Sequence, residues 1–339
     1  METKVLSSGI PHSHLPPSYV RPESERPCLS QVSTCDDVPL IDLSSPHTSL
    51  ILTQIAHACK SYGFFQVINH GVSVEAVKKM TEVAYEFFSL PVEEKMKLYS
   101  DDPSKTVRLS TSFNVKKEKV HNWRDYLRLH CYPLHHYLPH WPSNPPSFKE
   151  TVRNYCTEVR ELGLRIQEYI AQSLGLEKDY IKQVLGEQGQ HMAVNYYPPC
   201  PEPELTYGLP GHTDPNALTI LLQDLHVSGL QVLKDGKWVA IKPHPNAFVI
   251  NIGDQIQALS NGIYKSVWHR AVVNSEKPRL SVASFLCPHD DALISPAKPL
   301  TQDGSAPMYR SFTYTEYYSK FWSRDLDKQH SCLELFKNE

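Results

Sequence analysis

Two histidines and an aspartate in the second half of the chain are candidate metal ligands. His212 and Asp214 are separated by one residue, and His269 follows much later, in a stretch (263–272) that is typical of a strand. Because alternate side chains of a strand share a face, His212 and Asp214 are predicted to point inward from one strand, 211–214. Two histidines and one carboxylate that leave other metal positions open are typical of non-haem Fe(II) oxygenases.

An arginine and a serine form a second candidate group soon after His269. Arg279 and Ser281 are two positions apart, so a strand over 279–287 would place both on one face, together with Phe285. A guanidinium fork with a hydroxyl beside it can bind a carboxylate. A zinc hydrolase is the competing interpretation of the metal ligands, but it leaves this pair without a role. The two groups together therefore favour iron beside a carboxylate receptor.

Candidate substrate contacts lie in the first half of the chain. The stretch 123–131 alternates as a strand, in which Tyr126 and Arg128 share a face. Arg128 has two interpretations: a surface salt bridge, because arginine is mostly exposed, or a second carboxylate receptor for an acidic substrate. Phe113 and the segment 122–126 are candidates for further pocket walls, although their aromatic residues also suit plain core.

Short strands separated by turn residues dominate the chain from Gln190 onward. Asp235-Gly236 between two of them is a hairpin signal. About eight short strands in one run predict a double-sheet jelly roll, in which distant segments bring side chains to one mouth. The expected strands are 191–197, 211–214, 217–223, 230–233, 237–241, 246–251, 263–272 and 279–287.

The region before this run is predicted to contain strands and amphipathic helices. Apolar residues at three- and four-residue spacing predict helices over 50–61 and 74–88, and a long helix from 148 to about 174 that supports the sheet. Short strands are expected at 38–43 and 63–71. The predicted fold is therefore a mostly β core with flanking helices, an N-terminal region of helices and strands, and a C-terminal helix.

These patterns divide the chain into four parts. Residues 1–37 are rich in proline and polar side chains, which predicts an extended arm laid on the surface. Residues 38–188 are the N-terminal region with the long helix, 189–300 the jelly-roll core, and 301–339 a C-terminal helical segment. Residues 100–122 are polar and lack a period, so a loop is expected, and whether it closes as a lid stays open.

Composition and charge exclude several classes of protein. The 339 residues are 40% hydrophobic and 21% charged, as in an ordinary globular protein. A net charge of −3 offers no cationic excess for nucleic acid or an acidic membrane. The sequence shows no secretory signal and no apolar run that could span a bilayer, and its eight cysteines are scattered. Reduced thiols, a cytoplasmic monomer and no membrane partner are therefore expected, with the nucleus as an open alternative.

Together the motifs resemble those of plant soluble 2-oxoglutarate- and Fe(II)-dependent dioxygenases. The resemblance covers nearly the full chain. It is carried by 38–43, 63–71, 195–201, His212-Thr213-Asp214, His269 and Arg279-Leu280-Ser281. The fold that this resemblance implies is a distorted double-stranded β-helix flanked by helices.

The resemblance also implies roles for the candidate residues and the small molecules that they bind. His212, Asp214 and His269 would be ligands of Fe(II). Four further residues would contact the co-substrate 2-oxoglutarate: Arg279, Ser281, Tyr197 and Asn195. O2 would be the second co-substrate, and ascorbate would support activity.

Within this family, the stretches 109–117, 122–130 and 186–193 resemble the downy-mildew-resistance salicylate hydroxylases. Flavonoid-oxidising relatives tend to carry an aromatic residue where Arg128 stands, which favours a small phenolic acid as substrate. The implied reaction is ring hydroxylation of salicylic acid, mainly at the 5-position with the 3-position as alternative, which would lower salicylate and suppress plant immunity. Arg128 would hold the carboxylate and Phe285 would pack on the ring.

Two other functions stay open at this point. A flavone synthase or another flavanone-oxidising dioxygenase is the alternative enzyme, because close relatives have such activities. A non-catalytic sensor of phenolic acids is the alternative from another class. The intact set of metal ligands opposes the sensor, since a sensor needs no open iron positions.

Overall fold

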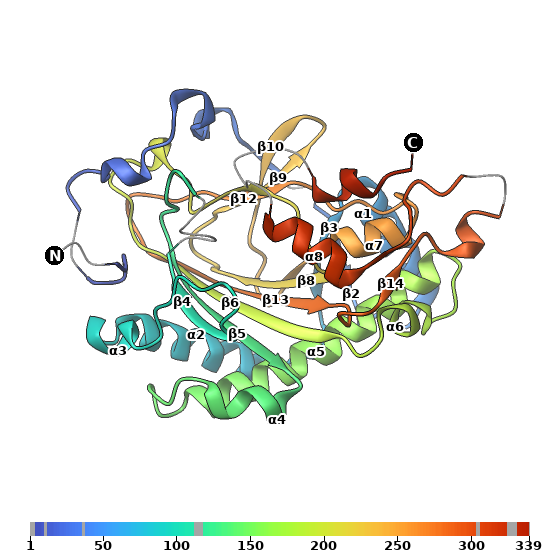
Figure 1. Cartoon of the computed structure of the whole chain (residues 1–339), viewed down its shortest axis with the longest axis horizontal. Helices are drawn as coiled ribbons and strands as arrows, with labels where there is room; N and C mark the ends of the chain where they lie inside the picture. The colour runs from blue at the N-terminus through green and yellow to red at the C-terminus, as the bar shows by residue number, and fades with distance from the viewer. Residues whose placement is uncertain are drawn as a thin grey trace.

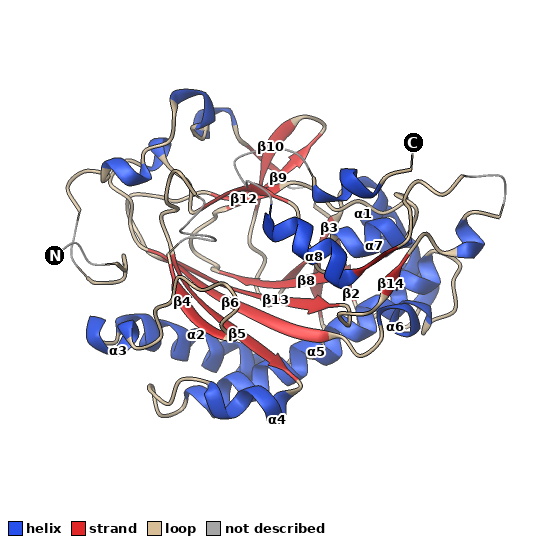
Figure 2. Cartoon of the chain, viewed as in Figure 1, coloured by secondary structure: helices blue, strands red, loops and turns tan. Residues whose placement is uncertain are grey.

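The computed structural model describes residues 4–9, 12–35, 38–111, 118–302, 306–323 and 331–338. Two β-sheets face each other, and a layer of helices covers the outer face of the larger sheet (Figure 1). Colouring by secondary structure shows the long strands of the larger sheet crossing the molecule between these helices and the smaller sheet (Figure 2).

The larger sheet has eight strands within the described residues, in the order β2-β3-β11-β8-β13-β6-β5-β4. Its neighbours are antiparallel except β2 and β3, which run parallel. The strands are β2 (Leu40–Asp42), β3 (Phe64–Ile68), β4 (Val107–Ser110), β5 (Asp125–Tyr132), β6 (Gly189–Tyr197), β8 (Leu218–Gln223), β11 (Phe248–Ile252) and β13 (Arg279–Cys287). Strands from both halves of the chain therefore share one sheet.

The smaller sheet has five described strands in the order β1-β10-β9-β12-β7. They are β1 (Ser33–Cys35), β7 (Leu209–His212), β9 (Leu230–Lys234), β10 (Lys237–Ile241) and β12 (His269–Ala271). The predicted hairpin joins β9 and β10, and both turn residues, Asp235 and Gly236, have positive φ. A further pair of short strands is β14 (Leu293–Ile294) and β15 (Phe312–Thr313).

The long helix α5 (Phe148–Ser173) supports the larger sheet from outside. Its buried residues recur at helical spacing, from Val152 to Ile170. Helices α1 (Thr48–Ser61) and α2 (Val74–Ser89) pack against α5 and complete the helical layer. The other described α-helices are α3 (Val92–Met96), α4 (Leu134–Tyr137), α6 (Tyr180–Leu185), α7 (Asp254–Leu259) and α8 (Tyr314–Ser323).

This architecture confirms the prediction of a mostly β core with flanking helices and a C-terminal helix. The main hydrophobic core lies between the helical layer and the larger sheet, where Phe65, Tyr155 and Ile220 are fully buried. Within the described residues, the helices are all too short or too polar to cross a bilayer.

The structure corrects the predicted strand 211–214. Strand β7 ends at His212, so Thr213 and Asp214 lie beyond it. The backbone carbonyl of Asp214 accepts a hydrogen bond of 2.9 Å from the N–H of Asp254 at the start of α7. Asp214 is therefore oriented by a loop and a helix start rather than by the alternation of a strand.

The predicted strand 263–272 is also much shorter, because β12 begins only at His269. A turn at Asn261 and Gly262 precedes it, and both residues have positive φ. The backbone N–H of Ser266 donates to the side chain of Gln257 at 2.7 Å, so a side chain helps to hold this segment before β12 begins.

The predicted loop 100–122 contains a strand, β4, which pairs with β5 at the edge of the larger sheet. The sequence pattern concealed this strand because its interior position is taken by Arg108, which is fully buried. Its Nη1 donates to the hydroxyl of Tyr126 at 2.9 Å, and its Nε donates to the carbonyl of Ser100 at 2.8 Å. The question of a lid falls on residues 112–117, which lie outside the described residues.

The N-terminal arm is anchored in the interior as well as laid on the surface. Leu6 is buried, and its backbone N–H donates to the carboxylate of Asp125 at 3.0 Å. The buried amino group of Lys95 donates to the hydroxyl of Ser7 at 3.0 Å. At its other end the arm contributes β1, which the sequence did not predict and which pairs with β10.

Candidate active site

A cavity of about 190 Å³ lies between the two sheets. Alternate residues of β6, β8 and β13 line it, because every second side chain of a strand points to the same face. Strands β7 and β12 supply the opposite wall, and residues of α8 line a further side. The three candidate metal ligands, Arg279 and Ser281 all border this one space.

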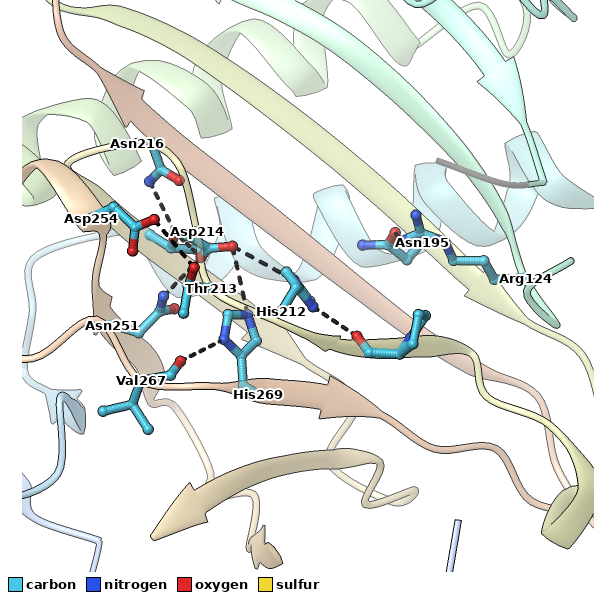
Figure 3. A network of polar contacts seen from close by, with 12 residues as sticks. Arg124, Asn195, His212, Thr213, Asp214, Asn216, Asn251, Asp254, Val267 and His269 are labelled. Carbon is cyan, nitrogen blue, oxygen red and sulfur yellow. Dashed lines mark hydrogen bonds and ion pairs between the residues drawn. The ribbon is translucent and has the colours of Figure 1, made fainter. Parts of the chain in front are cut away.

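The candidate metal ligands come together although they are far apart in the sequence (Figure 3). Nε2 of His212 and Nε2 of His269 each lie 3.6 Å from Oδ1 of Asp214. Pairing of β7 with β12 sets the two histidines opposite each other, with ring centroids 4.2 Å apart. The candidate ligand atoms all lie within 4.8 Å of one another, so one metal ion can contact all three.

Backbone carbonyls orient both imidazole rings. Nδ1 of His212 lies 2.9 Å from the carbonyl oxygen of Pro210, and Nδ1 of His269 lies 3.1 Å from that of Val267. Since a carbonyl can only accept, each Nδ1 carries the proton and each Nε2 keeps its lone pair. This tautomer is the one that metal-binding histidines adopt when a carbonyl fixes the other ring nitrogen.

Asp214 presents one oxygen to the histidines and has the other held by the protein. Oδ2 accepts hydrogen bonds from Thr219 Oγ1 at 2.6 Å and from Asn251 Nδ2 at 2.8 Å. Thr219 and Asn251 are partners in the register of β8 and β11, so the larger sheet positions this carboxylate. Oδ1 is thereby left facing the two imidazoles.

The protonation states suit a divalent metal. Burial, followed by the nearby His269, lowers the pKa of His212 to about 3. Burial would raise the pKa of Asp214, but the two histidines and the hydrogen bonds to Oδ2 hold it below its usual value. At neutral pH His212 is therefore neutral and Asp214 is a carboxylate, which are the forms that bind metal ions. Two imidazoles and one carboxylate fit Fe(II), and by themselves they also fit zinc.

A buried cation, Arg279, lies at the start of β13 in the larger sheet. Arg279 is only 2% exposed, and its Nε and Nη1 are buried without a hydrogen-bond partner among the described residues. In the register of β13 and β6, Arg279 is opposite Tyr197 and Ser281 is opposite Asn195. An unpaired buried guanidinium is unfavourable until an anion reaches it, so this group fits a carboxylate.

Two glycines leave the room in which Arg279 and Tyr197 lie. A Cβ added at Gly229 would come within 2.8 Å of Cδ and Nε of Arg279. A Cβ at Gly208 would come within 2.5 Å of the ring of Tyr197. The guanidinium lies 5.1 Å from the centroid of that ring, so the two side chains are packed together with no space for a larger neighbour.

The predicted substrate residues are only partly brought together. Tyr126, Arg128 and Phe285 all line the cavity, from strands β5 and β13 on either side of β6. Arg128 also turns outward, because its Nη2 donates to the carbonyl of Lys105 at 2.6 Å and to that of Pro103. Phe113 lies outside the described residues.

One group of lining residues was missing from the sequence prediction. Tyr314, Tyr318 and Trp322 of α8 face the cavity, and their four-residue spacing along a helix is a signal that could have identified them. Arg124 belongs to the segment 122–126, which was predicted as a possible pocket wall, and it does line the cavity. Its positive charge contributes to the lowered pKa of His212. Arg124, Tyr126 and Arg128 alternate along the chain and therefore share one face.

Comparison with known proteins connects this geometry to a family. The 2OG-Fe(II) oxygenase superfamily matches residues 188–288, which contain the metal ligands and Arg279. The N-terminal region of a non-haem dioxygenase in morphine synthesis matches residues 38–146. The two matches lie on either side of the long helix α5.

Several relatives are similar over their full lengths. Protein DOWNY MILDEW RESISTANCE 6 of Arabidopsis thaliana is 69% identical, over 100% of both chains. Flavanone 3-dioxygenase 2 of Oryza sativa subsp. japonica is 63% identical, over 98% of this chain and 97% of that one. A crystal structure of JOX2 in complex with 2OG, Fe and JA superimposes with a TM-score of 0.88 at 39% identity, covering 98% of this chain and 96% of the other.

A zinc hydrolase has no counterpart in these matches, whereas 2OG and Fe are present in the JOX2 structure. The predicted family and the predicted cofactors, Fe(II) and 2-oxoglutarate, are therefore confirmed. With relatives aligned end to end, and with two histidines and a carboxylate gathered between its two sheets, this chain belongs to the 2OG-Fe(II) oxygenase superfamily, as a dioxygenase of the DOWNY MILDEW RESISTANCE 6 type.

Proposed function

We propose that this dioxygenase hydroxylates the ring of salicylic acid, mainly at the 5-position to give 2,5-dihydroxybenzoate, with the 3-position as the minor alternative. The observation that carries this proposal is the charge of the cavity. Among the described lining residues, five are arginines and two are acidic, Glu118 and Asp214. A small apolar ring with a carboxylate suits such a space better than a neutral substrate does.

His212, Asp214 and His269 are the proposed ligands of Fe(II), through Nε2 of each histidine and Oδ1 of the carboxylate. The hydrogen bonds to Nδ1 and Oδ2 support this assignment, because they direct the remaining lone pairs to one point. When bound, Fe(II) with 2-oxoglutarate and O2 supplies the oxidising chemistry, and the protein supplies binding and orientation. Ascorbate is proposed to support activity.

Arg279 and Ser281 are the proposed receptor for the far carboxylate of 2-oxoglutarate, with Tyr197 and Asn195 as further contacts. The unpaired buried nitrogens of Arg279 support this role, since they are charged donors that a carboxylate entering the cavity could approach. Charge pairing in a buried place holds the co-substrate at a fixed distance from the metal. The chain thereby orients 2-oxoglutarate before the phenolic substrate arrives.

The proposed walls of the substrate site are Tyr126, Arg128, Phe285 and Phe113. Phe285 lies four residues after Ser281 on β13 and faces the same cavity. This position supports packing of Phe285 against the ring of the substrate. The aromatic residues of α8 would exclude water from the opposite side. By removing salicylate the enzyme would suppress plant immunity, acting as a cytoplasmic or nuclear monomer without a nucleic-acid or membrane partner.

A flavanone-oxidising activity is the second candidate function. It is favoured by one specific observation, the 63% identity to a rice protein named Flavanone 3-dioxygenase 2. The buried cations of the cavity favour the acidic substrate, because a neutral flavanone would leave them unpaired. A sensor without catalysis, the candidate from another class, conflicts with the family to which the chain belongs.

The test is a substrate panel with purified enzyme, Fe(II), 2-oxoglutarate and ascorbate, with and without O2. Salicylate should be consumed only in the presence of O2, with one succinate formed for each dihydroxybenzoate. Naringenin serves as the flavanone and benzoate as the acid without a phenol. Salicylate that remains unchanged while naringenin is converted would replace the proposal with the second candidate. Failure to form succinate with every compound would point to the sensor.

A further inference from the structure

The cavity contains more arginines than the co-substrate can use. Among the described lining residues these are Arg21, Arg124, Arg128, Arg270 and Arg279. If Arg279 pairs with the far carboxylate of 2-oxoglutarate, four guanidinium groups remain as candidates for the carboxylate of the substrate. They differ in which of their nitrogen atoms already have partners within the protein, and this difference separates them.

Arg270 and Arg21 already form hydrogen bonds within the protein. Nε of Arg270 donates to Gln231 at 2.7 Å, and its Nη1 donates to the hydroxyl of Tyr207 at 3.0 Å. Its guanidinium also lies 4.1 Å from the ring of Trp238. Nη2 of Arg21 donates to Asn122 at 2.8 Å. These contacts tie both guanidinium groups into the packing of the smaller sheet and the N-terminal arm.

Arg128 is only partly buried. Its Nε, like that of Arg124, is buried without a partner among the described residues, but its Nη2 already donates to the carbonyls of Pro103 and Lys105. These carbonyls belong to the exposed segment before β4, so they draw the end of the guanidinium away from the cavity. A substrate carboxylate at Arg128 would have to share or displace two contacts that the protein already makes. Sharing Nη2 in this way weakens a bidentate fork, because the fork needs two free neighbouring donors.

Arg124 is 4% exposed and has a different arrangement. Nη1 donates to Oδ1 of Asn195 at 2.9 Å, while Nε is buried without a partner among the described residues. The guanidinium lies 4.6 Å from the ring of Tyr126, so one face is covered. Because Asn195 occupies Nη1, the edge formed by Nε and Nη2 is the one left for a planar carboxylate.

The position of Arg124 also suits a group that binds substrate beside the co-substrate. Asn195, which it contacts, is opposite Ser281 on β13 and opposite Tyr126 on β5. Figure 3 shows Arg124 and Asn195 on the side of His212, away from the hydrogen bonds that hold Asp214. A carboxylate at this point would lie at the margin of the metal centre, with the rest of the cavity available to the ring.

We propose that Arg124, oriented by Asn195 and by the ring of Tyr126, is the residue that binds the carboxylate of the aromatic acid, and that Arg128 forms a wall without pairing to it. This inference depends on the proposed function and makes it more specific. It assigns the substrate carboxylate to a guanidinium that is buried and already oriented, so that the side chain loses little conformational freedom when the substrate binds.

The test compares salicylate with salicyl alcohol, which has the same ring and phenol but no charge. Binding is measured by calorimetry on enzyme loaded with Mn(II) and 2-oxoglutarate without O2, so that no turnover occurs. Wild type should bind salicylate more tightly than the alcohol. Arg124→Met should weaken salicylate binding by roughly 10- to 100-fold, the loss expected for a hydrogen-bonded charged group, and should leave the alcohol nearly unchanged.

Arg128→Met is the matched control, because it removes the same group from the same strand face. It should preserve the preference for salicylate over the alcohol. Arg124→Lys retains the charge without the fork and should bind salicylate with an affinity between those of wild type and Arg124→Met. It also serves as a second variant in case Arg124→Met does not fold. The affinity for 2-oxoglutarate should change less than about threefold in all three variants.

Three results would overturn the inference. If Arg128→Met abolishes the preference and Arg124→Met keeps it, the carboxylate binds Arg128 and the proposed function still stands. If Arg124→Met weakens 2-oxoglutarate as much as salicylate, Arg124 belongs to the co-substrate site. If wild type binds salicylate no better than the alcohol, the proposed substrate and the inference fail together.

Discussion

The metal end and the anion-binding side of the cavity differ in how fully the protein satisfies their polar atoms. At the metal end, Nδ1 of His212, Nδ1 of His269 and Oδ2 of Asp214 all have hydrogen-bond partners. Just before β5 and on β13, buried nitrogens of Arg124 and Arg279 have none among the described residues. The first region therefore suits an ion that stays, and the second suits anions that enter and leave, as the proposed function requires.

The largest effect is expected from removing the carboxylate at the metal end. Asp214→Ala deletes the oxygen that faces both histidines, at 3.6 Å from each Nε2. Iron content should fall to background, and formation of succinate should become undetectable. Metal analysis after dialysis and a succinate assay measure this result. A variant that keeps stoichiometric iron and normal turnover would contradict the assignment of the metal end.

The next largest effect concerns the buried cation on β13. Arg279→Met should raise the KM for 2-oxoglutarate by roughly 100-fold, because a charge-assisted pair in a buried place is lost. The KM for salicylate should change far less. Steady-state kinetics with each compound varied in turn separate the two effects. Arg279→Lys is the matched control and should recover part of the affinity, since it restores charge without the fork.

A smaller effect is expected where the protein holds a ligand indirectly. Thr219→Val removes the hydroxyl that donates to Oδ2 of Asp214 at 2.6 Å and leaves Asn251 as the other donor. Metal affinity should fall by roughly 10- to 100-fold, the usual range for such partners. Competition with a fluorescent chelator measures the affinity. An unchanged value would mean that the sheet does not set the position of this carboxylate.

The smallest effect concerns stability at low pH and the stacked pair His130 and His191, whose ring centroids are 3.9 Å apart. Burial lowers the pKa of His130 from 6.5 to about 4, and burial also lowers that of His191. Between about pH 6.5 and 4 the unfolded chain therefore binds protons that the folded chain does not. The stability from these two residues is complete at neutral pH and is lost as the pH falls through this window.

Urea unfolding of the metal-free protein measures this dependence. From pH 7 to pH 5 the free energy of unfolding should fall by roughly 2 kcal/mol for His130 alone. His130→Gln should reduce the slope with pH, whereas replacement of the exposed His244 should not. Equal slopes for wild type and His130→Gln would show that folding does not lower the pKa of His130.

The comparison of the two regions also explains where prediction from sequence succeeded. Strand alternation identified Arg279, Ser281 and Phe285 as one face, and β13 extends over 279–287 as expected. It also identified the shared face of Tyr126 and Arg128 on β5. These side chains lie on regular strands, where the direction of each side chain follows from its position alone.

Prediction was wrong where neighbours outside the segment decide the structure. Asp214 lies beyond β7 and is oriented by Thr219 and Asn251, which follow later in the chain. The strand β4 was concealed because Arg108 occupies an interior position, where hydrogen bonds to Tyr126 and to the carbonyl of Ser100 help to make its burial favourable. The local sequence pattern could not identify Thr219, Asn251 or Tyr126 as partners, because they lie on other strands than the residues they contact.

The sequence by itself determined the donor set, its order along the chain and the family, because residue types and a two-residue strand period are local properties. Only the tertiary structure decided which guanidinium nitrogens stay unpaired, since that depends on carbonyls and amides brought near from distant segments. The burial that lowers the pKa of His212 to about 3 likewise arises only when two sheets and α8 close around the cavity.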